Sequence, residues 1–374
     1  MFIELAIKLG VSVLVLGGVL NFAGMQTWLE RKQSALMQDR IGANRAYFTL
    51  PWWWAAPINW VLRKLGGLGI LNAVADVIKL LTKEDIVPVT ANKFLHTLAP
   101  FLSVLFAVLA FAAIPIGQDV QWGGRMIPLQ VANINAGLLA VLAIGSLGVY
   151  GVILAGMVSG SNLATLGGLR AASQVIAYEI ALGVSLIGAV ICYGTLDLPT
   201  MIARQGNLVW GWLPAWGIVL QPLGCVIFMT AALAHTKRVP FDLPESEPEI
   251  IGYFTEYSGM KFGLFFLTDF VEVVLAAALT TTLFFGGWQV PYLSPEGFHV
   301  PWGGFIPVSH AAYVGLGVGA FTVKVVAFIW FFMLVRWTLP RFRYDQLMRL
   351  GWKILFPLSL ANIALTGIVA VALR

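Results

Sequence analysis

Five carboxylates lie in one short stretch, residues 237–263, "KRVPFDLPESEPEIIGYFTEYSGMKFG". The whole chain has only 18 acidic residues, so this is a marked concentration: Asp242, Glu245, Glu247, Glu249 and Glu256. Carboxylates held this close raise one another's proton affinity, so the group is easily protonated. A solvated acidic loop could have the same composition, but the rigid, apolar "PFDLP" at its centre favours a packed loop with a function.

Charged residues also lie inside long apolar runs: Glu179, Asp269, Glu272 and Lys324. A charge at bilayer depth costs at least ~2.5 kcal/mol, so each requires an internal partner or a hydrated path. Asp269 and Glu272 are three residues apart and share a helical face. We interpret these acids as candidates for a proton or ion path. For Glu272 and Lys324 the alternative is an ion pair that locks helices together.

The composition indicates the elements that must position these residues. The 374-residue chain is 59% hydrophobic and 11% charged, whereas a soluble domain has about 25% charged residues. A helix needs about 20 apolar residues to cross a bilayer. We therefore predict an all-α polytopic membrane protein, a single membrane domain over 1–374, with eight transmembrane helices at residues 3–26, 94–116, 134–158, 171–193, 214–235, 260–286, 311–337 and 352–372.

Basic residues predict the orientation of these helices. The loops after the first, third, fifth and seventh spans hold fifteen lysines and arginines, whereas the other loops hold Arg125 and Arg204. By the positive-inside rule, the acidic loop at 236–259 is cytoplasmic and both termini lie outside. The net charge of +5 is therefore a sign of membrane orientation and not of nucleic-acid binding.

The first cytoplasmic loop has two unusual segments. "LGILNAVADVIKLLTKED", residues 68–85, has an apolar face and predicts an amphipathic helix lying at the membrane interface. The preceding segment, residues 47–64, contains four tryptophans and two prolines. The prolines should interrupt any long helix, and the tryptophans are typical interfacial anchors.

The acidic loop also has a helix-start signal. Ser246 and Glu249 have capping-box spacing, and Pro248 is tolerated in a first helical turn. We therefore expect a helix that starts near Glu247 and continues into the sixth span. Such a helix would place Glu249, Tyr253 and Glu256 on one face.

The sequence provides little for redox chemistry within this chain. Cys192 and Cys225 lie in separate apolar runs, too few and too far apart for an iron–sulfur cluster. The four histidines do not form the paired sets that would hold haem, and "LGGLG" at 65–69 follows no strand. We therefore expect no metal site and no bound cofactor in this chain alone.

Four motifs resemble one known family: "TWLERKQSALMQDRIGANRA", "ADVIKLLTKED", "KRVPFDLPESEPEIIGYFTEYSGMKFGLFF" and "RWTLPRFRYDQLMRLGWK". They are similar to the H subunit of NADH–quinone oxidoreductase, respiratory complex I, in order and over nearly the whole length. The resemblance implies a protein of the bacterial inner membrane that forms most of the quinone chamber and links quinone reduction to proton translocation. It implies quinone as substrate, with iron–sulfur clusters and FMN in partner subunits. The implied partners are soluble iron–sulfur and quinone-site subunits and antiporter-like membrane subunits.

The resemblance also assigns residues by position. Those matched to the quinone chamber and acidic loop are Glu30, Arg31, Arg40, Asp76, Lys79, Arg238, Asp242, Glu245, Glu247, Glu249, Glu256 and Tyr257. Glu179 matches a carboxylate of the fourth span, and Asp269 stands where the family often has Glu followed by Tyr. With His235 and Glu272, they are our candidates for the proton path.

This sequence departs from the family at several positions. The family's "GPN" is "GAN" at 42–44, and residues 47–64 resemble an insertion. Ser146 stands where some members have a third-span Glu, and His235 where an acid commonly precedes the "RxPFDL" arginine. The last two differences bear directly on the proton route.

Two alternatives stay open at the level of sequence. One is the related membrane component of an energy-converting hydrogenase or another ferredoxin-linked complex, which would need no quinone. The other is a stand-alone secondary transporter, which should have inverted repeats and interrupted helices in corresponding halves. Neither transporter feature is evident in this sequence.

Overall fold

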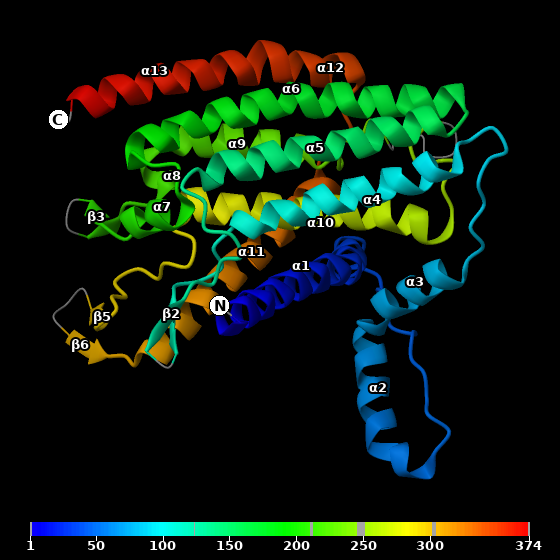
Figure 1. The fold of residues 1–374 in the computed structure, drawn as a ribbon, viewed down its shortest axis with the longest axis horizontal. Helices are drawn as coiled ribbons and strands as arrows, with labels where there is room; N and C mark the ends of the chain where they lie inside the picture. Colours follow the sequence, from blue (N-terminus) through cyan, green and yellow to red (C-terminus); the bar gives the residue numbers. More distant parts are fainter. Residues whose placement is uncertain (1, 123, 210–211, 245–250, 301–303, 373–374) are drawn as a thin grey trace.

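The computed structural model describes residues 2–122, 124–209, 212–244, 251–300 and 304–372, and most of them are helical (Figure 1). The long helices are α1 (Phe2–Met37), α4 (Lys93–Leu109), α5 (Gly137–Val158), α6 (Asn162–Tyr193), α10 (Gly259–Phe284), α11 (His310–Thr338) and α13 (Phe356–Ala372). The shorter helices are α2 (Ala56–Leu68), α3 (Leu71–Thr82), α7 (Leu198–Gln205), α8 (Gly217–Leu220), α9 (Pro222–His235) and α12 (Tyr344–Arg349).

Short antiparallel hairpins close one end of the bundle, at the left of Figure 1. They pair β1 (Val120–Trp122) with β2 (Arg125–Ile127), β3 (Leu208–Val209) with β4 (Leu213–Pro214), and β5 (Gly297–Val300) with β6 (Gly304–Pro307). Helix α1 begins and α13 finishes toward this same end of the bundle. Residues 236–244 and 251–258 lie at the opposite end, which we call the loop end.

Within the described residues, seven helices are long and apolar enough to cross a membrane, and they coincide with seven of the eight predicted spans. The protein is therefore an all-α polytopic membrane protein, as predicted. Helix α10 has the most buried membrane-length window, and it packs against α1, α4, α9 and α11. The apolar core is therefore built around the helix that contains Asp269 and Glu272.

The prediction of one long helix for the fifth span is wrong. Residues 217–235 form α8 and α9, separated at Gln221, and α9 has only 14 residues. A 14-residue helix is about 21 Å long, shorter than the ~30 Å hydrocarbon core. Pro222 lacks an N–H for a helical hydrogen bond, so the helix restarts there. The Gln221 side chain holds the break by bonding Thr366 and Asn362 of α13.

Two helices extend beyond their predicted bounds. Helix α1 does not finish at residue 26 but continues to Met37, so Glu30 and Arg31 lie on its last turns. Helix α6 begins at Asn162, nine residues before the predicted start of the fourth span. In α1 the added residues are largely polar, whereas in α6 residues 162–170, "NLATLGGLR", are mostly apolar and end at Arg170. The α1 extension brings the Glu30 carboxylate next to Arg238, just after α9.

The amphipathic segment of the first loop forms α3, as predicted. Its apolar side chains Val74, Val77, Ile78 and Leu81 are about half exposed, which leaves an apolar face for a membrane interface or another chain. The tryptophan-rich segment forms short elements, as the prolines predicted. The η1 turn (Trp53–Ala55) leads into α2, with Pro57 in its first turn, and α2 meets α3 at 90°.

The predicted helix from Glu247 into the sixth span is also wrong. Residues 251–258 form turns and extended backbone, and α10 begins at Gly259; residues 245–250 lie outside the described part. The rings of Tyr253 and Tyr257 pack edge-on against Phe265, at centroid distances of 5.4 and 5.0 Å. In a continuous helix, residues 253 and 265 would be about 18 Å apart. The chain therefore folds back on α10, and packing outweighs the local capping signal.

Candidate functional site

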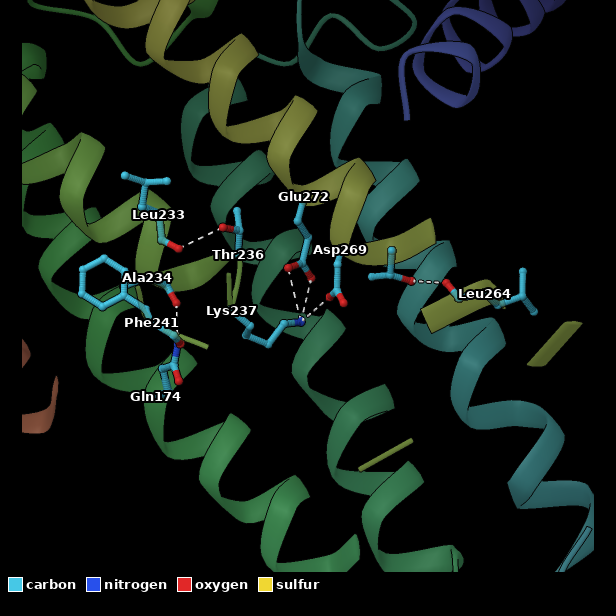
Figure 2. A network of polar contacts seen from close by, with 10 residues as sticks. Gln174, Leu233, Ala234, Thr236, Lys237, Phe241, Leu264, Asp269 and Glu272 are labelled. Atoms are coloured by element: carbon cyan, nitrogen blue, oxygen red, sulfur yellow. Dashed lines mark hydrogen bonds and ion pairs between the residues drawn. The ribbon is translucent and has the colours of Figure 1, made fainter. Parts of the chain in front are cut away.

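The first residues after α9, 236–244, return into the bundle instead of projecting into solvent. Thr236, Lys237 and Asp242 are buried, and Lys237 has a φ of +54°, which is unusual for a residue other than glycine. The Gln174 side chain of α6 donates to the carbonyls of Ala234 at 2.8 Å and Phe241 at 2.7 Å (Figure 2). One amide of α6 therefore fixes both ends of the turn that contains Lys237.

Lys237 is the centre of a buried charge cluster. Its Nζ lies 3.2 Å from Asp269 Oδ1 and 3.3 Å from Glu272 Oε2, and its side chain is 2% exposed (Figure 2). Burial acts to lower the pKa of Lys237, but the negative charges of Glu272 and Asp269 outweigh burial and raise it above its ordinary value. Lys237 is therefore a cation at physiological pH. With both carboxylates ionised, the cluster has a net charge of −1.

A cavity of about 40 Å³ lies beside this cluster. Its polar lining comes from Glu179 of α6, His235 of α9 and Glu272 of α10, surrounded by apolar side chains. A water molecule needs roughly 10–15 Å³ of such volume, so the cavity has room for two or three waters. Glu272 thus contacts Lys237 and also lines a space that can hold water next to two other titratable groups.

A second cluster is formed by the next residue in the chain. Arg238 pairs with Glu30 of α1, and Arg336 at the end of α11 pairs with the same Glu30 oxygen. The Arg238 guanidinium also lies 4.0 Å from the ring centroid of Phe270, a cation–π contact. Consecutive residues Lys237 and Arg238 therefore bind carboxylates of α10 and α1, and Glu30 links α1 to α11 through Arg336.

Two further ion pairs lie closer to the surface. Arg341 Nη2 is 2.9 Å from the buried Asp242 carboxylate, and it ties the segment after α11 to the "PFDLP" turn. Arg31 Nη2 is 2.7 Å from Asp76, and it ties α1 to α3. The predicted residues Glu30, Arg31, Asp76, Arg238 and Asp242 therefore all lie in ion pairs.

Other predicted residues lie apart from these clusters. Arg40 is exposed and donates to Gln38 at 2.6 Å, and Lys79 and Glu256 are also exposed. Tyr257 is buried and stacks on His96 with 3.9 Å between ring centroids; burial raises the pKa of its hydroxyl. Residues outside the described part are Glu245, Glu247 and Glu249.

Sequence reasoning missed the partners Lys237, Arg336 and His96. Lys237 was counted with the basic residues that set orientation, although two buried acids three residues apart require a nearby cation. For Arg336 the signal was its position at the end of a predicted span. His96 has no comparable signal, because its stacking on Tyr257 depends on the fold of residues 251–258.

Lys324 has a separate role from the acids. Its Nζ donates to the carbonyls of Phe285 at 2.8 Å, Gly287 at 3.0 Å and Gln289 at 2.7 Å, just after α10. These bonds satisfy carbonyls that have no helical partner at a helix C-terminus. Lys324 therefore caps α10, and the ion-pair interpretation applies to Glu272 and not to Lys324.

Among the described residues, no group of three or more histidines, cysteines, aspartates and glutamates could hold a metal ion. Cys192 and Cys225 are both free thiols. The functional groups of this part of the chain are therefore carboxylates, basic side chains and histidines in a mostly apolar bundle. Such a site can bind a charged group, stabilise its charge and pass protons between its own side chains.

Comparison with known proteins identifies the family. The family model described as NADH dehydrogenase matches residues 9–367. An NADH-quinone oxidoreductase H subunit of Geobacter metallireducens is 42% identical over 98% of this chain and 97% of its own length. The corresponding protein of Thermomicrobium roseum, with the same name, is 43% identical over 96% and 94%. Another protein of that name, from Cytophaga hutchinsonii, is 42% identical over 93% and 92%. The chain therefore belongs to the H-subunit family of NADH-quinone oxidoreductase.

Proposed function

We propose that this chain is the membrane subunit of a proton-pumping NADH–quinone oxidoreductase, in which it forms the quinone chamber and couples quinone reduction to proton translocation. The observation that carries the proposal is the pair of buried clusters made by consecutive residues. Arg238 lies with Glu30 and Arg336 near the loop end, and Lys237 lies with Asp269 and Glu272 inside the bundle. A charge change at the first cluster is therefore one residue away from the second.

The chemistry of quinone reduction suits this arrangement. A quinone that accepts two electrons gains negative charge, which is costly in a dry chamber unless cations or proton donors lie nearby. Arg238 supplies a fixed positive charge at the loop end. The carboxylates around Lys237 supply sites whose protonation responds to that charge. Coupling requires an interaction that differs between the two states of the quinone, and the charge change provides it.

The proposed proton route runs from the acidic loop to the hydrated cavity. It passes Glu30 and the carboxylates held by Lys237, of which Glu272 faces the cavity, and then crosses the cavity to His235 and Glu179. Ser146 of α5 lies next to this cavity, whose lining includes Leu142 and Gly145, and its hydroxyl donates to the Leu142 carbonyl at 2.9 Å. We therefore assign the proton relay at this point to His235, which stands where relatives tend to have an acid.

The proposal also covers the substrate, the partner subunits and the membrane location of the chain. Quinone is the substrate, and iron–sulfur clusters and FMN belong to partner subunits. A soluble subunit at the loop end delivers the electrons, while antiporter-like membrane subunits contact the bundle. We place the protein in the bacterial inner membrane, with the acidic loop cytoplasmic and both termini outside.

Two variants in the intact complex test this function. Asp269→Asn should lower coupled quinone reduction and proton pumping together by about tenfold or more, while electron transfer from NADH to an artificial acceptor continues, because partner subunits perform it. Arg238→Ala should lower quinone-dependent turnover in the same selective way. Asp85→Asn is the control, since the Asp85 side chain is half exposed in its ion pair with Lys261 at 2.8 Å. Normal pumping by Asp269→Asn, or equal loss of both activities in assembled complex, would contradict the proposal.

A further inference from the structure

Lys237 stands out because two carboxylates share one ammonium group inside the bundle. Its Nζ lies at nearly equal distances from Asp269 and Glu272, 3.2 and 3.3 Å, and the three side chains are almost fully buried. An ion pair that served only to join helices would need one carboxylate. The second carboxylate leaves the cluster with an uncompensated negative charge, which is costly in an apolar bundle.

We propose that Lys237 is a positioning residue of the proton path: by neutralising one of the two carboxylates, it keeps the Asp269–Glu272 pair able to take up and release a single proton. This inference rests on the proposed function, because it concerns the same path. It assigns a role to a residue that the family motif did not single out.

The geometry determines which carboxylate exchanges the proton. Glu272 lines the cavity shared with His235 and Glu179, whereas Asp269 contacts the ammonium of Lys237. A proton from a cavity water or from His235 therefore reaches Glu272, which becomes a neutral carboxylic acid. Lys237 keeps its three protons and stays paired with Asp269, and the net charge of the cluster changes from −1 to 0. Release of the proton from Glu272 to the cavity restores the original state.

Neighbouring charged groups support this division of roles. Arg238, the next residue, pairs with Glu30, which also binds Arg336. His235 and Glu179 face Glu272 across the cavity. The cluster's own charge balance therefore depends on Lys237, which the Gln174 bonds and its left-handed backbone hold in position.

Removal of the Lys237 ammonium should leave one proton bound to the Asp269–Glu272 pair. In Lys237→Met, two carboxylates one helical turn apart have no cation between them, so one of them holds a proton more tightly. We expect the alkaline limb of the coupled quinone-reductase pH profile to move up by at least one pH unit, a tenfold change in proton affinity. Infrared difference spectra should show an additional protonated carboxyl group. Lys237→Arg, which keeps the charge, should retain the wild-type profile.

A double variant separates charge balance from a merely structural tie. In Asp269→Asn alone, the Lys237 ammonium pairs only with Glu272 and keeps that carboxylate ionised. Glu272 then takes up no proton, so coupling is lost. Lys237→Met with Asp269→Asn returns the cluster to a net charge of −1, carried by Glu272, and should recover most of the coupled rate and the wild-type pH limb. Lys353→Met, at an exposed position, is the control and should change neither quantity.

The outcomes distinguish the two proposals. An unchanged pH limb in Lys237→Met, or a double variant no better than either single variant, overturns the role of Lys237. If Lys237→Met fails to assemble, the double variant decides: recovered assembly and pH limb support charge balance, and continued failure shows a structural tie. If Glu272→Gln also pumps at the wild-type rate, the proton path of the proposed function fails as well.

Discussion

Glu30→Ala removes the carboxylate that binds Arg238 and Arg336 at the same time. The Glu30 side chain is 13% exposed, and both guanidinium groups lie mostly inside the bundle. After the substitution, two cations face each other without the carboxylate that joined them. They repel each other across the junction of α1, α11 and the turn after α9, so we expect this junction to open.

The magnitude follows from burial. Breaking a buried ion pair by removing one partner costs about 3–5 kcal/mol, and Arg336, at 26% exposed, favours the lower part of that range. The matched control is Asp76→Ala, which removes the partner of Arg31, the residue next to Glu30. That pair is 44% and 36% exposed, and exposed pairs contribute about 0–1 kcal/mol. A difference of about 3 kcal/mol corresponds to more than a hundredfold change in the opening equilibrium.

Thermal inactivation of the assembled complex in membranes measures this difference, with the amount of assembled complex determined on native gels. Glu30→Ala should lose assembled complex at a markedly lower temperature than Asp76→Ala, which should follow the wild type. Adding Arg336→Met to Glu30→Ala should recover part of the loss, because one of the two unpaired cations is removed. Equal behaviour of Glu30→Ala and Asp76→Ala would refute the reasoning from burial.

Substitutions at Gln174, Lys324 and His235 test other parts of the site. Gln174→Leu should destabilise the turn after α9, at about 0.5–1.5 kcal/mol for each of the two hydrogen bonds lost, because the carbonyls of Ala234 and Phe241 keep only their backbone donors; faster proteolysis near residue 238 should reveal it, and unchanged proteolysis would contradict the contact. Lys324→Met should lower the inactivation temperature, because three carbonyls after α10 lose their donor; Lys353→Met, at an exposed position, should not. His235→Glu should keep most of the coupled activity with a different pH profile, whereas His235→Leu should lose it, since histidine titrates near neutral pH and leucine cannot relay a proton. A His235→Leu complex that matches wild type at every pH would exclude His235 from the path.

The sequence alone determined the class of protein and most of its helices. Long apolar runs can satisfy their backbone hydrogen bonds in a bilayer only as helices or closed barrels, so composition and run length are strong signals. Seven membrane-length helices and the amphipathic α3 were predicted for this reason. Asp269 and Glu272 were also recognisable, because a carboxylate in an apolar run is costly and demands a partner.

Tertiary structure decided where the helices are interrupted and which charged side chains pair. The capping signal at Ser246 and Glu249 predicted a helix through Tyr253, but the rings of Tyr253 and Tyr257 gain more by packing on Phe265. The fifth span breaks at Gln221, whose partners on α13 lie more than 140 residues away in the chain.

The same holds for the charge clusters. Lys237 and Arg238 are adjacent in sequence, yet they bind carboxylates on α10 and α1. Sequence spacing predicts neighbours on one helix face, but it does not specify how separate helices pack or which way a turn directs its side chains. Those pairings depend on the packed bundle, because burial makes each ion pair strong and leaves each cation few carboxylates within reach.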